Sequence, residues 1–294
     1  MAGKVQNKII VVNSFKGGAG KTTLALTHCM DALFHQRKYE NVVYIDLDIL
    51  GTATSYLFDK EKLPLDKCFN QTGTGTEVPL AYDGESRRLH VVYLSPELKM
   101  QSMYGGLNYM NHQELVQQRL RDDILDYVRG IVGKQKGNLI VFDCAPGFSR
   151  MEQELLKACY DMKLDKKADI MEEYVATLDS GHIEKCVECI RDSWETLLIP
   201  PEFRKVRLTL NDIQNYYRYA EEDEKMDAEK QLGEMAETLA ARLKREDDVH
   251  NTEICFWRYS KEIAMRSIFM HQWFVENQID SYIMTSDSYR IYTA

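Results

Sequence analysis

A glycine-rich run between residues 14 and 23 has the residue types and the spacing to hold a polyphosphate. It directly follows a short apolar stretch and precedes a helical pattern, which is the strand–loop–helix context of a phosphate-binding loop. Glycines let successive backbone N–H groups turn toward an anion, while a lysine adds a cation and a hydroxyl can ligate Mg²⁺. The sequence therefore predicts a phosphate site made by Lys16, Gly17, Gly18, Ala19, Gly20, Lys21, Thr22 and Thr23.

This loop departs from the common phosphate-binding pattern at its start. The usual first glycine, five residues before Gly20, is Phe15 here, and Lys16 follows it. In the ordinary scheme Lys21 contacts the β- and γ-phosphates and Thr22 holds Mg²⁺, so a second lysine has no role. The full string KGGxGKTT is also much more specific than an isolated glycine pattern.

Three aspartates end apolar runs and are candidates for the rest of the site. Asp46 and Asp48 are two residues apart, so their side chains start on the same side of the backbone. Asp143 ends a separate apolar run, and carboxylates at such places can hold Mg²⁺ or orient a water molecule. For Asp46 simple solvation at a strand end stays open beside a role near Mg²⁺, and Asp48 could instead cap the following turn.

The elements around these residues alternate between strand and helix patterns. Continuous apolar runs predict strands buried on both faces at residues 8–13, 41–46, 89–94, 138–143, 173–178, 206–210 and 253–256. Apolar stripes with helical spacing occupy residues 21–34, 115–131 and 183–197. We expect an α/β fold with a mainly parallel sheet flanked by helices, forming one domain over residues 1–294 with an acidic helical elaboration at about 215–248. That acidic helix is either a solvated face or a surface for a partner.

Composition and charge narrow the class of protein. The chain has 294 residues, of which 44 % are hydrophobic and 28 % charged, so it is neither disordered nor stapled by disulfides. Its net charge of −9 is concentrated after residue 150, which argues against general affinity for nucleic acid. The one CxxC pair, Cys186 and Cys189, falls in a predicted helix and has no second ligand pair, so a structural role is expected. No apolar run approaches a membrane span and no signal segment is recognisable, so we expect a cytoplasmic protein with reduced thiols.

In these motifs the chain resembles the ParA/MinD family of deviant Walker A ATPases. The matches follow the family's order: the loop itself, then residues 44–54, which are similar to its DxDPQGNAT motif, and residues 141–147, which are similar to its DxxPG motif. Residues 208–211 resemble the strand that ends in an asparagine near the adenine. Ile49 and Leu50 stand where the family has Pro-Gln, and the Lys- and Leu-rich amphipathic C-terminal helix of the membrane-bound MinD branch is missing.

The resemblance implies a P-loop NTPase of the ParA/MinD type with ATP and Mg²⁺ as cofactors and no membrane partner. It gives catalytic roles to Lys16, Lys21 and Asp48, with Lys16 reaching across an ATP-sandwiched homodimer and Asp48 orienting the attacking water. Thr22, Asp46 and Asp143 would form the Mg²⁺ shell, and Asn211 would lie near the base. It also implies slow hydrolysis that an activating protein partner stimulates, in the positioning of DNA or a protein assembly.

Nonspecific DNA binding is the usual partner mode of the ParA branch, and it stays open here. Phosphate contacts need local positive charge, but the candidate basic residues all lie in the acidic half: Arg204, Lys205, Arg207, Arg218, Arg242, Lys244 and Arg245.

Three other classes are alternatives. An ATP-dependent metabolic ligase of the same superfamily would need a substrate pocket with its own polar groups, and an electron-transfer iron protein would need a cysteine pair that the chain lacks before its fourth strand. A bacterial tyrosine kinase is suggested only by Tyr282, Tyr289 and Tyr292, in a chain that has 17 tyrosines.

Overall fold

The computed structural model describes residues 6–48, 75–82, 84–93, 109–134, 137–147, 150–165, 167–197, 199, 203–211, 222–243, 252–257 and 289–293. Their strands form one sheet in the order β3-β4-β2-β5-β1-β6-β7-β8-β9. The strands are β1 (Asn7–Ser14), β2 (Asn41–Asp46), β3 (Thr76–Tyr82), β4 (Glu85–Tyr93), β5 (Asn138–Pro146), β6 (Ala168–Thr177), β7 (Val206–Asn211), β8 (Thr252–Trp257) and β9 (Tyr289–Thr293). All neighbouring strands run parallel except β3 with β4 and β8 with β9, so the predicted mainly parallel α/β sheet is confirmed.

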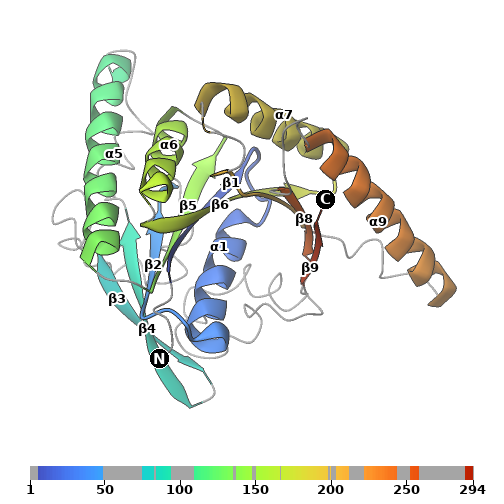
Figure 1. Ribbon diagram of the computed structural model, residues 1–294, viewed down its shortest axis with the longest axis horizontal. Helices are drawn as coiled ribbons and strands as arrows, with labels where there is room; N and C mark the ends of the chain where they lie inside the picture. Colours follow the sequence, from blue (N-terminus) through green and yellow to red (C-terminus); the bar gives the residue numbers. More distant parts are fainter. Residues whose placement is uncertain are drawn as a thin grey trace.

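Helices cover both faces of the sheet (Figure 1). One face carries α1 (Lys21–Met30), which continues as a π-helical turn, η1 (Asp31–Gln36). The other face carries α5 (Tyr109–Lys134), α6 (Arg150–Leu164), α7 (Ser180–Leu197) and α9 (Glu222–Leu243). Alternate residues of the central strands enter different cores, which is why their sequences are continuously apolar: in β1, Ile10 packs on the α1 side and Ile9 on the α5–α6 side. No helix in these described segments is long and apolar enough to span a membrane.

The predicted acidic helix is present as α9, and the remainder of the predicted 215–248 segment lies outside the described residues. The apolar stripe of α9 buries Leu232, Leu239 and Leu243 against α7 and the β7–β8 end of the sheet. Cys186 and Cys189 both lie in α7 as free thiols, so their predicted place in a helix is confirmed, and the structural role of the pair stays a prediction. Tyr289 and Tyr292 belong to the edge strand β9, whereas Tyr282 is outside the described residues.

Two adjacent glutamates of β6 are buried on opposite faces of the sheet. Glu172 is bound by the Arg204 guanidinium through Nε at 2.8 Å and Nη2 at 2.6 Å. Glu173, on the α1 side, lies 2.5 Å from His28 Nε2 and accepts a hydrogen bond from Thr209 at 2.5 Å. Burial alone would raise the pKa of Glu173, but the charges of His28 and Arg207 and these hydrogen bonds lower it to about 2. The second network therefore ties α1 to β6 and β7 through an ionised carboxylate.

We expect the Glu173→Gln variant to lose part of the acid sensitivity of folding. In the native protein the pKa of Glu173 is about 2 against an ordinary 4.5, so its stabilising contribution is complete above pH 4.5 and disappears as the pH falls toward 2. Below pH 4.5 the free energy of unfolding should therefore fall less steeply in the variant, by up to about 1.4 kcal/mol per pH unit. Urea unfolding at several pH values between 5 and 3 measures how steeply the free energy of unfolding falls with pH. The variant Glu237→Gln, which changes an exposed glutamate, is the control. Equal slopes in the wild type and Glu173→Gln would contradict this assignment.

Candidate functional site

The phosphate-binding loop connects β1 to α1 at the carboxyl edge of the central strands. Gly18 and Gly20 have φ angles of +78° and +91°, which L side chains rarely adopt. A Cβ atom at Gly17 or Gly18 would meet nothing within 4 Å, so the space beside these residues is open. Gly20 is the N-cap of α1 and no side chain caps the first turn. The N–H groups at this helix start can therefore donate to an anion.

Lys21 lies in a buried charged cluster at the first turn of α1. Its Nζ is 2.5 Å from Asp143 Oδ1 and 3.9 Å from Asp48 Oδ2, while the Tyr44 hydroxyl donates to Asp143 Oδ2 at 2.6 Å. Burial alone would lower the pKa of Lys21, but Asp143 and Asp48 outweigh it and raise this pKa. Lys21 is therefore cationic at neutral pH, and the structure brings two other predicted site residues, Asp48 and Asp143, next to it.

Asp46 shapes the chain that follows β2. Its Oδ1 accepts a hydrogen bond from the backbone N–H of Asp48 at 3.0 Å, and the residue is only 1 % exposed. The alternative of a solvated carboxylate at the strand end is therefore wrong. Asp46, which ends β2, is the register partner of Asp143 in β5, so both carboxylates face the α1 side of the sheet together with Tyr44.

Asn211 holds the loop from the other side. It ends β7, and its Nδ2 donates to the Ala19 carbonyl at 2.8 Å. A Cβ atom at Gly20 would lie 2.2 Å from Asn211 Nδ2 and 3.9 Å from the Trp257 ring, so only glycine fits there. Asn211 thus contacts the backbone of the loop, at the point where β7 and β8 end side by side.

Lys16 differs from Lys21 because its side chain is exposed. In the described part of the chain, no hydrogen bond or ion pair involves its ammonium group. It lies near the start of α7, where its charge and the burial of His182 lower the pKa of that histidine. His182 Nδ1 accepts from the Thr177 N–H at 3.2 Å, which fixes the first turn of α7 on the end of β6.

These residues fit a nucleoside triphosphate with Mg²⁺. The open glycine cradle and the uncapped start of α1 suit phosphate oxygens, and Lys21 supplies a buried cation. The Thr22 hydroxyl, Asp46 and Asp143 are oxygen donors of the kind Mg²⁺ prefers. Sequence reasoning missed Tyr44, His182 and Trp257. Tyr44 gave little signal, because its partner Asp143 is 99 residues away, and His182 lies at the start of a helix whose sequence shows no reason for a histidine there.

Comparisons with known proteins place this fold and loop in a family. Residues 10–255 match the model of the CobQ/CobB/MinD/ParA nucleotide binding domain. The chain therefore belongs to this family of nucleotide-binding proteins, whose ParA/MinD members are P-loop NTPases. No curated protein sequence matches it.

Solved structures agree on the fold. A plasmid partition protein from Borrelia burgdorferi is 16 % identical with a TM-score of 0.50, over 87 % of this chain and 92 % of that one. The pNOB8 ParA structure is 16 % identical with a TM-score of 0.53, over 84 % and 74 %. A Cyanothece McdA variant in complex with ATP is 14 % identical with a TM-score of 0.52, over 90 % and 87 %. At these identities the likeness concerns the fold.

Proposed function

We propose that this chain is an ATP-binding and ATP-hydrolysing switch that closes into an ATP-dependent sandwich dimer. The observation that carries the proposal is the contrast between its two loop lysines. Lys21 is buried in the cluster with Asp143 and Asp48, whereas Lys16 is exposed on the same loop. One cation is thus placed for the chain's own nucleotide, and the other is available to a second copy.

The roles of the residues follow from their positions. Lys21 exchanges its contact with Asp143 for phosphate oxygens and neutralises their charge, while backbone N–H groups of the loop orient the phosphates. Bound Mg²⁺ supplies charge neutralisation at the β- and γ-phosphates, held by Thr22 and Asp143 with Asp46 nearby. The Asp46 carboxylate accepts a hydrogen bond from the backbone N–H of Asp48 and so fixes the position of Asp48, which orients the attacking water. Asn211 holds the backbone of the loop through its hydrogen bond to Ala19, on the side where the nucleotide base would lie.

Dimerisation completes the site in this scheme. The Lys16 ammonium reaches the phosphates bound by the partner subunit and stabilises the charge that develops in the transition state, as an arginine finger does in trans. Hydrolysis then depends on the dimer, and the dimer separates once ATP has been converted to ADP and phosphate. The cycle is a switch that a protein partner can accelerate, suited to partitioning or positioning of DNA or a protein assembly.

Four of the basic residues that were candidates for nonspecific DNA binding lie in the described part of the chain. Arg204 and Arg207 are 3 % and 8 % exposed and are bound to Glu172 and Glu253. Lys205 also pairs with Glu253, and Arg242 pairs with Glu184. Arg204 and Arg207 are thus engaged within the fold, and the more exposed Lys205 and Arg242 already face carboxylates, which argues against a phosphate-binding patch at these residues. Arg218, Lys244 and Arg245 lie outside the described residues. We therefore favour a protein partner over nonspecific DNA.

We expect the Asp48→Ala variant to bind ATP and to lose hydrolysis. Asp48 Oδ2 is 3.9 Å from Lys21 Nζ, so its removal leaves the stronger Lys21–Asp143 pair intact while removing the group that orients water. Phosphate release and ATP binding, measured on the same preparation, separate the two effects. The matched control is Asp122→Ala, on the exposed face of α5. Normal hydrolysis by Asp48→Ala would reject this role. Wild-type protein that releases no phosphate from ATP under any condition would reject the proposed function.

A further inference from the structure

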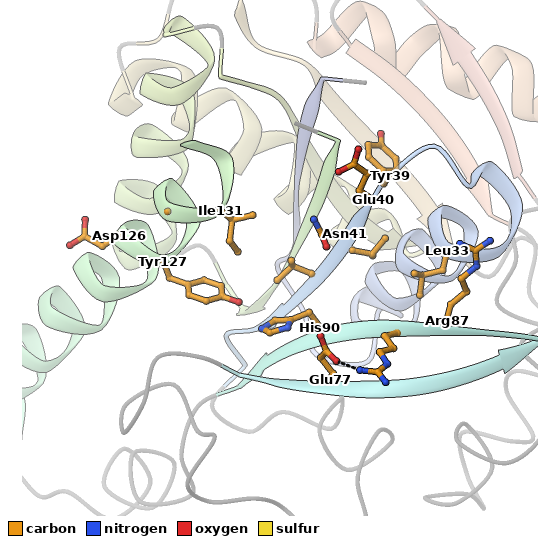
Figure 2. A pocket seen from close by; sticks show the side chains of 14 residues that line it. Leu33, Tyr39, Glu40, Asn41, Glu77, Arg87, His90, Asp126, Tyr127 and Ile131 are labelled. Atoms are coloured by element: carbon orange, nitrogen blue, oxygen red, sulfur yellow. Dashed lines mark hydrogen bonds and ion pairs between the residues drawn. The ribbon is translucent and has the colours of Figure 1, made fainter. Parts of the chain in front are cut away.

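A second pocket lies at the opposite edge of the sheet from the phosphate-binding loop. It has a volume of about 680 Å³, within the range of small-molecule sites. The start of β2, the end of the α1–η1 helix, the β3–β4 hairpin and the C-terminal third of α5 surround it (Figure 2). Because β1 and β2 run parallel through β5, the start of β2 is remote from the loop that follows the end of β1.

One wall of this pocket is aromatic. The rings of His90 on β4 and Tyr127 on α5 are stacked, with centroids 6.2 Å apart and planes 23° from parallel. Figure 2 shows the Tyr127 hydroxyl directed toward the space between the walls and Ile131 beside it. Burial raises the pKa of Tyr127 to about 12, so this phenol is a neutral hydrogen-bonding group at physiological pH. A flat ring can extend this stack while its edge meets polar atoms.

The charges around the pocket are already paired with one another. Arg88 is 2.7 Å from Glu77 across the hairpin, and Arg87 is 3.3 Å from Glu85. Asp126 is 3.4 Å from Arg129. Glu40, at the top of Figure 2, adds a further carboxylate. The lining thus has three carboxylates against two arginines, so a phosphate or carboxylate ligand would meet net negative charge, whereas amino and ring N–H groups would find acceptors.

A glycine near the C-terminal end of α5 keeps the pocket open. Gly130 lines the pocket, and a Cβ atom there would meet nothing within 4 Å. Glycine inside a helix costs up to about 1 kcal/mol relative to alanine, so its place on this face is unfavourable for the helix itself. It lets a ligand approach the helix backbone beside Tyr127.

We propose that this pocket binds an uncharged, planar heteroaromatic ring of nucleobase size. The aromatic wall provides the stacking surface, the Tyr127 hydroxyl and the rim carboxylates provide edge contacts, and Gly130 provides the clearance. The volume suits a nucleoside. The ring could come from a free nucleoside or from an unpaired base of a single strand, which share this chemistry. The site is independent of the proposed ATP switch.

The test uses the full chain without added nucleotide, and two matched variants separate binding in this pocket from binding at the phosphate-binding loop. Equilibrium dialysis measures adenosine, guanosine, cytidine, uridine and a single-stranded tetranucleotide with each of these bases. Gly130→Met fills the pocket, and Gly133→Met makes the same change at an exposed position of the same helix that also has open space. Both variants should fold, because methionine favours a helix more than glycine does.

At least one nucleoside or tetranucleotide should bind the wild type and Gly133→Met, with binding weakened roughly tenfold or more in Gly130→Met. Tighter binding of the tetranucleotide than of its nucleoside assigns the base to a nucleic acid, and the reverse assigns it to a free nucleoside. Absence of binding at about 1 mM, or equal binding by both methionine variants, would overturn the proposal. Because only Gly130→Met alters the pocket, failure of the ATP switch would not produce this pattern.

Discussion

Lys16→Ala is expected to lower ATP turnover by about 10³–10⁵-fold while leaving the folded monomer intact, the range found when a trans-acting cation is removed. The side chain is exposed, and no described hydrogen bond or ion pair depends on its ammonium group, so folding has little to lose. Its proposed contact exists only in the closed dimer, so the loss belongs to the transition state. Steady-state phosphate release and urea unfolding, measured together, check both parts.

Lys230→Ala, which removes an exposed lysine of α9, is the control for a general effect of charge. It should retain wild-type turnover. If Lys16→Ala hydrolysed ATP at the wild-type rate, hydrolysis would not depend on this lysine and the sandwich scheme would be wrong.

Lys21→Ala is expected to destabilise the protein by about 3–5 kcal/mol and to abolish ATP binding, because it leaves a buried charge without its partner. Asp143 is fully buried and its carboxylate lies 2.5 Å from Lys21 Nζ. Adding Asp143→Asn should restore most of the lost stability, since the amide carries no charge. The double variant should still bind no ATP, because the cation for the phosphates is missing. Urea unfolding and nucleotide titration provide the two measurements.

Recovery of the free energy of unfolding in the double variant would identify the buried Asp143 charge as the cause of the lost stability. A Lys21→Ala protein as stable as the wild type would contradict the buried pair, and ATP binding by the double variant would contradict the role of Lys21 at the phosphates.

The central strands could be predicted from the sequence because both of their faces are buried. β2 has the predicted bounds, and β1, β5 and β7 extend the predicted runs by one to three residues. The edge strand β3 was not predicted: it contains Pro79 and lies in a hairpin whose other strand carries Arg87 and Arg88. Its strand character depends on pairing with β4, which local sequence does not show.

The loop residues could be predicted because their chemistry is local, but the pairing of the charged side chains could not. Lys21 and Asp143 are separated by 122 residues, and only the parallel register of β2, β5 and β1 brings them together. Likewise, β6 carries Glu172 and Glu173 between apolar residues, and their partners lie on α1, on α6, on β7 and just before it. The contact of Asn211 with Ala19 joins residues 192 apart.

The most direct test of the ATP-dependent dimer is the molar mass of the Asp48→Ala variant in solution, measured by light scattering with ATP and Mg²⁺, with ADP and Mg²⁺, and without nucleotide. The chain mass is 34.2 kDa. We predict twice this mass with ATP and the monomer mass in the other two conditions. The same variant with Lys16→Ala added should stay monomeric in ATP. A monomer in all three conditions, with ATP shown to be bound, would contradict the account.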